Sequence, residues 1–331
     1  MTTPLGDWEP PRPLTANQGV YHYTSASGLL GMIQNGTLWA TEASGMNDLT
    51  EVVQGQKYLY EALTRLLPAE PGTSGSVREA LDGSNSLPEK PSGVFVLCAS
   101  LRDDDANQWR LYGDGGRGYS VELDSGVPLC VRSPREPVPA PRSVEDIGGH
   151  LSQLMDAADI SPWSRVMYTD EEQEEGVRSL IDWAREAHDI AEQAPVLDPE
   201  WGEPTPTEWF RWEAHDARSK LTRLMKTPGF AGEDEVRTVV TFGHSDRHVR
   251  YRSSRYGIVR HVELAPAHDG KDLWFAAPAG EAPRSPRRLP IRSIRLGPAL
   301  NFELAAPAVE SLLRAHGFES VEVLGSEVPL R

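Results

Sequence analysis

The sequence has little cysteine, a shortage of positive charge and no long hydrophobic run. Only Cys98 and Cys130 occur among 331 residues, which excludes a disulfide framework and a cysteine-rich zinc site. The net charge of −16 disfavours a duplex nucleic-acid binder, because phosphate neutralisation supplies most of the affinity of such proteins. No stretch approaches the ~18 apolar residues of a membrane span, and the N-terminal residues lack a basic segment followed by an apolar one. We therefore expect a cytoplasmic protein with no membrane partner.

The common catalytic signatures are absent as well. The sequence has no G-x-x-x-x-G-K-[ST] loop, no H-E-x-x-H helix, no C-x-x-C pair and no G-x-S-x-G turn. The glycines between Gly113 and Gly118 follow a predicted helix rather than a strand, so they do not fit a dinucleotide-binding loop. The acidic run Asp103-Asp104-Asp105 suits a helix N-terminus better than a metal loop. No metal site is predicted, and function must be sought in weaker local patterns.

What is present indicates a globular protein with a sizeable core. Hydrophobic residues make up 39 % of the chain and charged residues 25 %, both ordinary values. Strand-like runs are predicted at 20–24, 37–41, 93–100, 119–123, 235–242, 257–264, 293–296 and 320–324. Ser25 is predicted to cap a helix that Gly36 ends, Thr169-x-x-Glu172 reads as a capping box, and the chain from 305 to 316 reads as a helix.

These patterns predict one mixed α+β domain interrupted by a helical insertion. The predicted segments are an irregular arm at 1–18, a first α+β part at 19–130, a Pro-rich linker at 131–142, a helical insertion at 143–226 and a second α+β part at 227–331. A single sheet is the simplest arrangement, because the strands after residue 234 would otherwise need a sheet of their own.

A series of short motifs resembles an uncharacterised bacterial domain family. It begins with His22-Tyr23-Thr24-Ser25, followed by Met46-Asn47-Asp48 with Glu51 nearby, and by Cys98-Ala99-Ser100 at a strand end. It continues with Trp109-x-x-Tyr112-Gly113, then Phe230, Glu233, Glu235 and Arg237, and ends with Gly297-Pro298 and Ser326-x-x-Pro329-x-Arg331. Each motif is weak alone, but their order along the chain is fairly specific.

The first strand is also similar, more distantly, to the start of the DNA-modifying ADP-ribosyltransferase toxins and the related RNA 2′-phosphotransferases. That resemblance implies a split sheet with flanking helices and an enzyme that uses NAD as substrate. It implies that His22 and Thr24 bind NAD, and that a carboxylate supports the positive charge that builds on the ribose when nicotinamide leaves. The resemblance implies that an active member is an ADP-ribosyltransferase or NAD glycohydrolase that serves as a toxin or phage-defence effector, with a nucleic acid or a protein as acceptor.

Glu235 is the preferred carboxylate. With the period of two of a strand, Glu235 and Arg237 share a face, where Arg237 is a candidate to bind the negatively charged NAD. Glu233-x-Glu235 resembles the paired glutamates of arginine-targeting transferases. Glu122, on another predicted strand, is the rival. Trp109 and Tyr112 are candidates for stacking on a ligand ring, and Asn47, Asp48, Glu51 and Glu233 are further candidates.

Each candidate also has a structural interpretation. His22 could be a satisfied strand-edge histidine, Glu235 and Arg237 a structural ion pair, and Trp109 with Tyr112 part of the core. Two other functions therefore stay open. One is a catalytically silent module that binds a nucleotide or a partner, and the other is an RNA-end phosphotransferase or nuclease in which His244 and His248 would matter.

Overall fold

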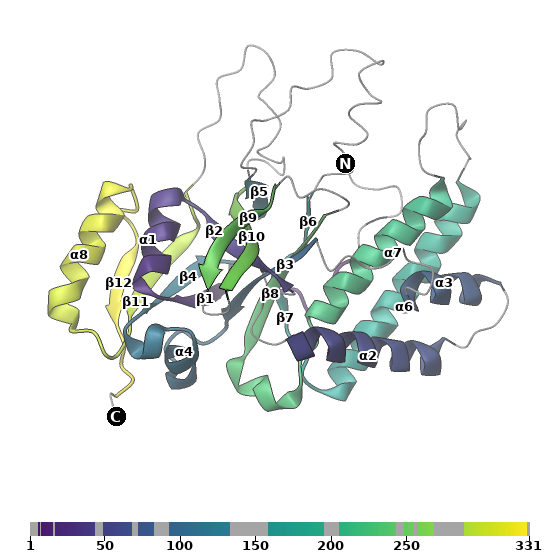
Figure 1. The fold of residues 1–331 in the computed structure, drawn as a ribbon, viewed down its shortest axis with the longest axis horizontal. Helices are drawn as coiled ribbons and strands as arrows, with labels where there is room; N and C mark the ends of the chain where they lie inside the picture. The colour runs from purple at the N-terminus through teal and green to yellow at the C-terminus, as the bar shows by residue number, and fades with distance from the viewer. Residues whose placement is uncertain are drawn as a thin grey trace, which may run out of the picture.

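The protein is described by a computed structural model at residue 6 and residues 8–15, 17–43, 49–67, 72–82, 93–132, 158–194, 205–242, 248–254, 257–267 and 288–329. The mixed α+β class predicted from the sequence is confirmed. Figure 1 shows the sheet in the middle of the molecule, with α8 (Phe302–Ala315) on one side and a group of helices on the other.

The strands form one mixed sheet. They are β1 (Gly19–Thr24), β2 (Leu38–Glu42), β3 (Val94–Ser100), β4 (Tyr119–Asp124), β5 (Leu129–Arg132), β6 (Ala158–Ile160), β7 (Ser164–Arg165), β8 (Glu235–Phe242), β9 (Arg250–Ser254), β10 (Gly257–Pro266), β11 (Ile291–Leu296) and β12 (Glu322–Gly325). Their order is β12-β11-β4-β1-β3-β2-β10-β5, with β8 on β3, β6 and β7 on β8, and β9 on β10. The β11–β12 pair is parallel, and the other described pairs are antiparallel.

Strand β3 is where the sheet divides. One of its edges pairs with β8 along its whole length, from Val94 to Ser100. Its other edge is shared, because Ser100 pairs with Tyr21 of β1, whereas Phe95 and Val96 pair with β2. Two half-sheets therefore spread from this edge, one through β1, β4, β11 and β12 and the other through β2, β10, β5 and β9. We call the gap between β1 and β2, opposite Leu97 to Ala99, the notch.

A hydrophobic core packs the half-sheets against α1 (Ala26–Asn35) and α8. Buried side chains from every part of the sheet enter it, among them Val20, Phe95, Val121, Val240 and Leu264. The local sequence fixes α1 as predicted. The hydroxyl of Ser25 accepts a hydrogen bond from the Gly28 amide, and Gly36 ends the helix in the left-handed conformation.

A second core lies between the helices α2 (Leu49–Leu66), α3 (Thr73–Asp82), α6 (Asp170–Gln193) and α7 (Pro206–Arg223). The predicted capping box of Thr169 and Glu172 opens α6. The helical layer is thus built from both parts of the chain, since α2 and α3 precede the segment 143–226. That segment is also not purely helical, because its described part contains β6 and β7, which join the sheet beside β8.

Other differences from the sequence-based expectation concern short elements. Helix α3 and strands β5 and β9 were not predicted from the sequence. The expected N-terminal arm is docked on the helical layer, where Trp8 is buried and Arg12 bonds to Glu172 and Glu175. The remaining short elements are α4 (Ala106–Leu111) and the 3-10 turns η2 (Asp114–Gly116) and η4 (Pro228–Glu233). Among the helices described, none combines the length and the apolar character needed to cross a membrane.

Candidate functional site

Four charged side chains meet under the surface at the start of β8. Arg237 donates from Nε to Oε1 of Glu235 at 2.8 Å and from Nη2 to Oε2 at 2.8 Å. Lys226 donates from Nζ to Oε2 of Glu235 at 3.1 Å and to Oε2 of Glu233 at 2.7 Å. All four residues are buried, so two cations and two carboxylates neutralise one another. We call Lys226, Glu233, Glu235 and Arg237 the buried ion cluster.

The cluster keeps Glu235 ionised. Burial alone would raise the pKa of this carboxyl, but the charge and hydrogen bonds of Arg237 and the charge of Lys226 outweigh it and lower the pKa to about 2. The neighbouring thiol of Cys98 behaves in the opposite way, because burial and the charge of Glu235 raise its pKa well above the ordinary value. At neutral pH the cluster therefore holds a carboxylate beside a protonated thiol.

Aromatic residues surround the cluster. The hydroxyl of Tyr112, at the end of α4, donates to Oε1 of Glu233 at 3.1 Å, and the hydroxyl of Tyr168 accepts from the Glu235 amide at 3.0 Å. The ammonium of Lys226 lies 4.6 Å from the centre of the Phe230 ring. Tyr112 and Phe230 are partly exposed, so two of the rings around the buried cluster are in contact with solvent.

The local chain positions Glu233 through its backbone. Asp234 adopts a left-handed conformation that ends η4, and the Glu233 carbonyl accepts hydrogen bonds from Ser100 Oγ at 2.7 Å and from Gln108 Nε2 at 3.0 Å. These bonds tie η4 to the end of β3 and to α4. Three of the sequence motifs therefore meet here, namely Cys98-Ala99-Ser100, the Trp109 to Gly113 motif and the Phe230 to Arg237 motif.

His22 lies at the notch. Its Nδ1 is 2.8 Å from the carbonyl oxygen of Cys98, and because a carbonyl can only accept, Nδ1 carries the proton. Burial lowers the pKa of His22, and the bond to Cys98 only partly opposes this. The neutral ring therefore has Nε2 as an acceptor, and within the described part of the chain no hydrogen bond to this nitrogen is recorded. The His22 side chain therefore donates to the Cys98 carbonyl the hydrogen bond that the amide of a neighbouring strand would otherwise donate.

His22 and Glu235 both adjoin Cys98 but approach it from different directions. In the register of β1, β3 and β8, Tyr21 pairs with Ser100, and Ser100 pairs with Glu235. Directly paired residues share a face, so Tyr21 is on the Glu235 face and His22 points away from it. Cys98 connects the two groups, because its carbonyl binds His22 and its thiol neighbours Glu235.

Thr24 lies two residues after His22 at the end of β1. A Cβ placed on Gly28 would come within 2.0 Å of the Thr24 hydroxyl oxygen, so the glycine leaves room for this side chain at the start of α1. Thr24 and His22 share a side of β1, as the sequence predicts. Tyr23 is buried on the other side.

The structure places the two stacking candidates differently. Trp109 is only 2 % exposed; it packs edge-on to Tyr23 with ring centres 4.8 Å apart and donates its indole N–H to Asp104 at 2.7 Å. Its ring is part of the packing between α4 and β1 rather than a platform for a ligand. Tyr112, in contrast, keeps an exposed edge next to Glu233.

The rival carboxylate Glu122 lies apart from the buried ion cluster, on β4. It accepts a hydrogen bond from Ser293 Oγ at 2.7 Å, and Arg292 is 4.0 Å away. Of the remaining candidates, Asn47 and Asp48 lie outside the described residues, and Glu51 lies in α2 with its side chain outside the description. His248 is buried, and His244 is outside the described residues.

Sequence reasoning missed Lys226 and Tyr168. Both stand in short connections without any periodic pattern, Lys226 between α7 and η4 and Tyr168 just before α6. A signal did exist, because two glutamates at a strand start within apolar sequence need compensating cations when they are buried. Arg237 supplies only one of them, so a second cation could have been sought.

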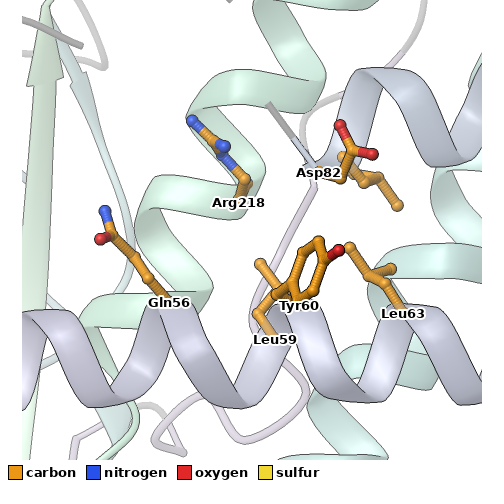
Figure 2. Close-up of a pocket in the computed structure, with 7 residues that line it drawn as sticks. Gln56, Leu59, Tyr60, Leu63, Asp82 and Arg218 are labelled. Atoms are coloured by element: carbon orange, nitrogen blue, oxygen red, sulfur yellow. The ribbon is translucent and has the colours of Figure 1, made fainter. Parts of the chain in front are cut away.

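A hollow lies elsewhere in the molecule. It has a volume of about 270 Å³ and lies in the helical layer, lined by residues of α2, α3 and α7. Figure 2 shows Gln56 and Tyr60 of α2 on one side, with Arg218 of α7 and Asp82 of α3 across from them. None of the motif residues lines this hollow, so the hollow gives no evidence about a reaction at the buried ion cluster.

Comparison with known proteins adds one family. Residues 108–238 match a family described as "Protein of unknown function (DUF2971)". The matched span begins in α4 and ends in β8, so it contains the whole buried ion cluster with Tyr112 and leaves out His22. No curated protein and no solved structure shows significant similarity to the chain.

Proposed function

We propose that the protein binds NAD at the notch and cleaves its nicotinamide–ribose bond, as an ADP-ribosyltransferase-like enzyme or an NAD glycohydrolase. The observation that carries the proposal is the arrangement about Cys98. On one side of this residue lies a neutral histidine with an available acceptor nitrogen, and on the other lies a buried carboxylate that stays ionised.

The reaction needs both kinds of group. In the proposed complex, Nε2 of His22 accepts a hydrogen bond from a hydroxyl of the nicotinamide ribose, which orients the sugar. The bond between ribose C1′ and nicotinamide N1 breaks, its electron pair leaves with neutral nicotinamide, and positive charge develops on the ribose. The negative charge of Glu235 favours that state only at a distance, because Glu235 lies on the opposite face of the sheet from His22 and is paired with Arg237 and Lys226. Attack of water at C1′ then gives ADP-ribose and releases one proton, whereas attack by an acceptor group gives ADP-ribosylation.

The test is to measure NAD binding by titration calorimetry and nicotinamide release by chromatography in the same samples. His22→Ala is compared with the parent and with His316→Ala, because His316 makes a similar Nδ1 contact with a carbonyl, that of Leu312 at 3.0 Å, on the exposed side of α8. We expect His22→Ala to abolish release and His316→Ala to leave it unchanged. Absence of NAD binding to the parent at millimolar concentration would rule the proposal out.

A second candidate is a catalytically silent nucleotide-binding module. The hydrogen bonds of Glu235 favour this candidate, because its two carboxylate oxygens already accept three N–H hydrogen bonds. The Glu235 side chain is also largely hidden from solvent. Such a carboxylate acts more readily as a structural anchor than as a partner for a ribose hydroxyl. Binding of NAD without nicotinamide release, in the presence and absence of candidate acceptors, would favour this module.

An enzyme that consumes NAD would be costly to the cell that makes it, which is the basis for proposing a toxin or a phage-defence role. The corresponding test is growth of a host that expresses the chain from an inducible promoter. We expect the parent to slow growth and Glu235→Ala to relieve it at equal protein levels. Equal toxicity of Glu235→Ala would remove Glu235 from the mechanism.

A further inference from the structure

A second group of polar and aromatic side chains lies on the other half-sheet, away from Glu235. It occupies one face of three adjacent strands, β2, β10 and β9. Thr41 pairs with His261, and His261 pairs with Arg250. Glu263 pairs with Trp39, and Arg252 pairs with Val259. Directly paired residues share a face, so all six side chains of the group lie on one side of the half-sheet: Trp39, Thr41, Arg250, Arg252, His261 and Glu263.

Among the described residues of these three strands, Arg252 is a positive charge without a counter-charge, whereas Arg132 of the adjacent strand β5, which pairs with Glu263, donates to the Asn35 carbonyl. Arg250 is paired with Glu263 at 3.2 Å. Arg252 donates from Nη2 to the Thr41 hydroxyl at 2.9 Å, and no carboxylate of the described residues lies within ion-pair distance of it. His261 adds no charge at neutral pH, because burial and then the charges of Arg252 and Arg250 lower its pKa to about 4. An uncompensated guanidinium is unexpected in a chain of net charge −16.

Several polar atoms at this place are buried without a hydrogen-bond partner in the described part of the chain. They are Nε of Arg252, Nε of Arg250 and Nδ1 of His261, and His261 itself is only 3 % exposed. Leaving a buried donor unsatisfied costs about 1–3 kcal/mol, so such groups usually mark the position of a water or a ligand. Oxygen atoms of an anion would suit the two guanidinium donors.

An aromatic ring lies beside these donors. The guanidinium carbon of Arg252 is 5.7 Å from the centre of the Trp39 ring, and the ring of His261 is 4.9 Å from it. Trp39 nevertheless remains 39 % exposed, which is unusual for the largest apolar side chain in the middle of a sheet. An exposed indole next to an unpaired guanidinium offers a flat surface and a charge a few ångströms apart.

We propose that this face of β2, β10 and β9 binds a nucleoside monophosphate, whose phosphate is held by Arg252 and whose base stacks on Trp39. The site uses neither His22 nor Glu235, and it stands whether or not the protein cleaves NAD. A phosphate accepts the fork of N–H donors that an arginine presents, and base–aromatic stacking contributes about 1–3 kcal/mol.

The chemistry favours a single nucleotide over a strand of nucleic acid. A single-strand binder needs successive aromatic platforms along a basic groove. The next exposed aromatic residue on these strands, Tyr251, lies between Arg250 and Arg252 in β9 and therefore points to the opposite face. One indole and one uncompensated cation match one base and one phosphate.

The experiment is titration calorimetry of the full chain with AMP, adenosine, inorganic phosphate and a single-stranded hexa-adenylate RNA. We expect AMP to bind at least about tenfold more tightly than adenosine or phosphate, which corresponds to about 1.4 kcal/mol. Arg252→Gln and Trp39→Leu should each weaken AMP binding about tenfold or more. Tyr251→Leu, on the opposite face of the same strand, is the matched control and should leave binding unchanged.

Two conservative variants keep the test decisive if Arg252→Gln or Trp39→Leu fails to fold. Trp39→Phe should retain most AMP affinity, and Arg252→Lys should lose about three- to tenfold, because a lysine keeps the charge but not the fork. Phosphate binding equal to AMP binding, or binding that is insensitive to Trp39→Leu, would overturn the nucleotide assignment. So would tighter binding of the RNA than of AMP, or no binding of any probe at millimolar concentration. Because His22→Ala leaves this site intact, failure here and failure of the NAD proposal are separate results.

Discussion

Glu235 and Arg237 lie two residues apart on the same face of β8, and the guanidinium of Arg237 donates one hydrogen bond to each carboxylate oxygen of Glu235. This two-bond arrangement fixes the orientation of the carboxylate as well as its charge. Lys226 completes the pairing from the chain that follows α7. Removing any one of these charges would therefore leave an opposite charge buried without full compensation and would destabilise this part of the sheet.

Removing one member of the buried ion cluster should be strongly destabilising. We expect Arg237→Gln to lower the free energy of unfolding by about 3–5 kcal/mol, because it leaves Glu235 buried with incomplete compensation. The measurement is urea unfolding followed by circular dichroism at pH 7. The control is Arg178→Gln, which breaks the exposed pair with Glu174 and should change the free energy by less than about 1 kcal/mol. Similar small effects for both variants would show that the cluster is more hydrated than its burial indicates.

Stability should fall with acid in two stages. The pKa of His261 is lowered to about 4 in the folded protein, so the unfolded chain binds a proton first and stability is lost as the pH falls from about 6.5 to about 4. Glu235 has a pKa of about 2 in the folded protein, so its contribution is present above about 4.5 and is lost as the pH falls toward 2.

The contribution of His261 to the loss of unfolding free energy in the first stage can be measured with the variant His261→Gln. We expect this variant to reduce the change in unfolding free energy between pH 6.5 and 4.5 by about 1–2 kcal/mol, after a discount for screening by solvent. Urea midpoints at four pH values are sufficient to measure it. An unchanged pH profile would mean that His261 has the same pKa in the folded protein as in the unfolded chain, about 6.5, so that it would add a charge to the proposed nucleotide site below that pH.

Measurements of kcat should distinguish the two candidate carboxylates, Glu235 and Glu122. If the protein releases nicotinamide from NAD, we expect Glu235→Gln to lower kcat by about tenfold, because it removes a charge that favours the ribose cation from the opposite face of the sheet. Glu122→Gln should change kcat by less than about twofold, since Glu122 lies on β4 with Ser293 as its hydrogen-bond donor. The reverse result would transfer the catalytic role to Glu122, provided that circular dichroism shows both variants to be folded at the assay temperature.

A glycine in α2 marks a close crossing of two helices. A Cβ on Gly55 would lie 2.5 Å from the carbonyl oxygen of Thr222 in α7, so Gly55→Ala should cost about 1–3 kcal/mol through overpacking. Gly31 of α1 is the matched control, since the nearest atoms to its added Cβ are 4.0 Å away. Gly31→Ala should be neutral or should gain up to about 1 kcal/mol from helix propensity. Thermal unfolding of both variants measures whether each substitution lowers or raises the melting temperature.

Local sequence signals were enough for most elements of this fold. Ser25, Gly36, Thr169 and Glu172 act where their chemistry predicts, because caps and capping boxes involve residues only a few positions apart. The short strands β5, β6, β7 and β9 were missed. Such short strands form because a neighbouring strand pairs with them through hydrogen bonds, and their own residues do not indicate which segment that neighbour is.

The candidate site was predicted only in part, for a similar reason. The alternation of Glu235 and Arg237 correctly indicates a shared face, but it cannot show that Lys226 joins them from another segment. The helical spacing of Trp109 and Tyr112 likewise does not distinguish a buried ring from an exposed one. The structure does so, with Trp109 inside and Tyr112 at the surface. The role of each group in catalysis stays a prediction for the experiments above.

The division of the sheet at β3 has a mechanical consequence. Within the described residues, the two half-sheets share backbone hydrogen bonds only through β3, and at its centre a single side chain, His22, binds the Cys98 carbonyl in place of a strand. At this point the angle between the half-sheets is therefore held by one histidine hydrogen bond and by the shared hydrophobic core rather than by a ladder of amides.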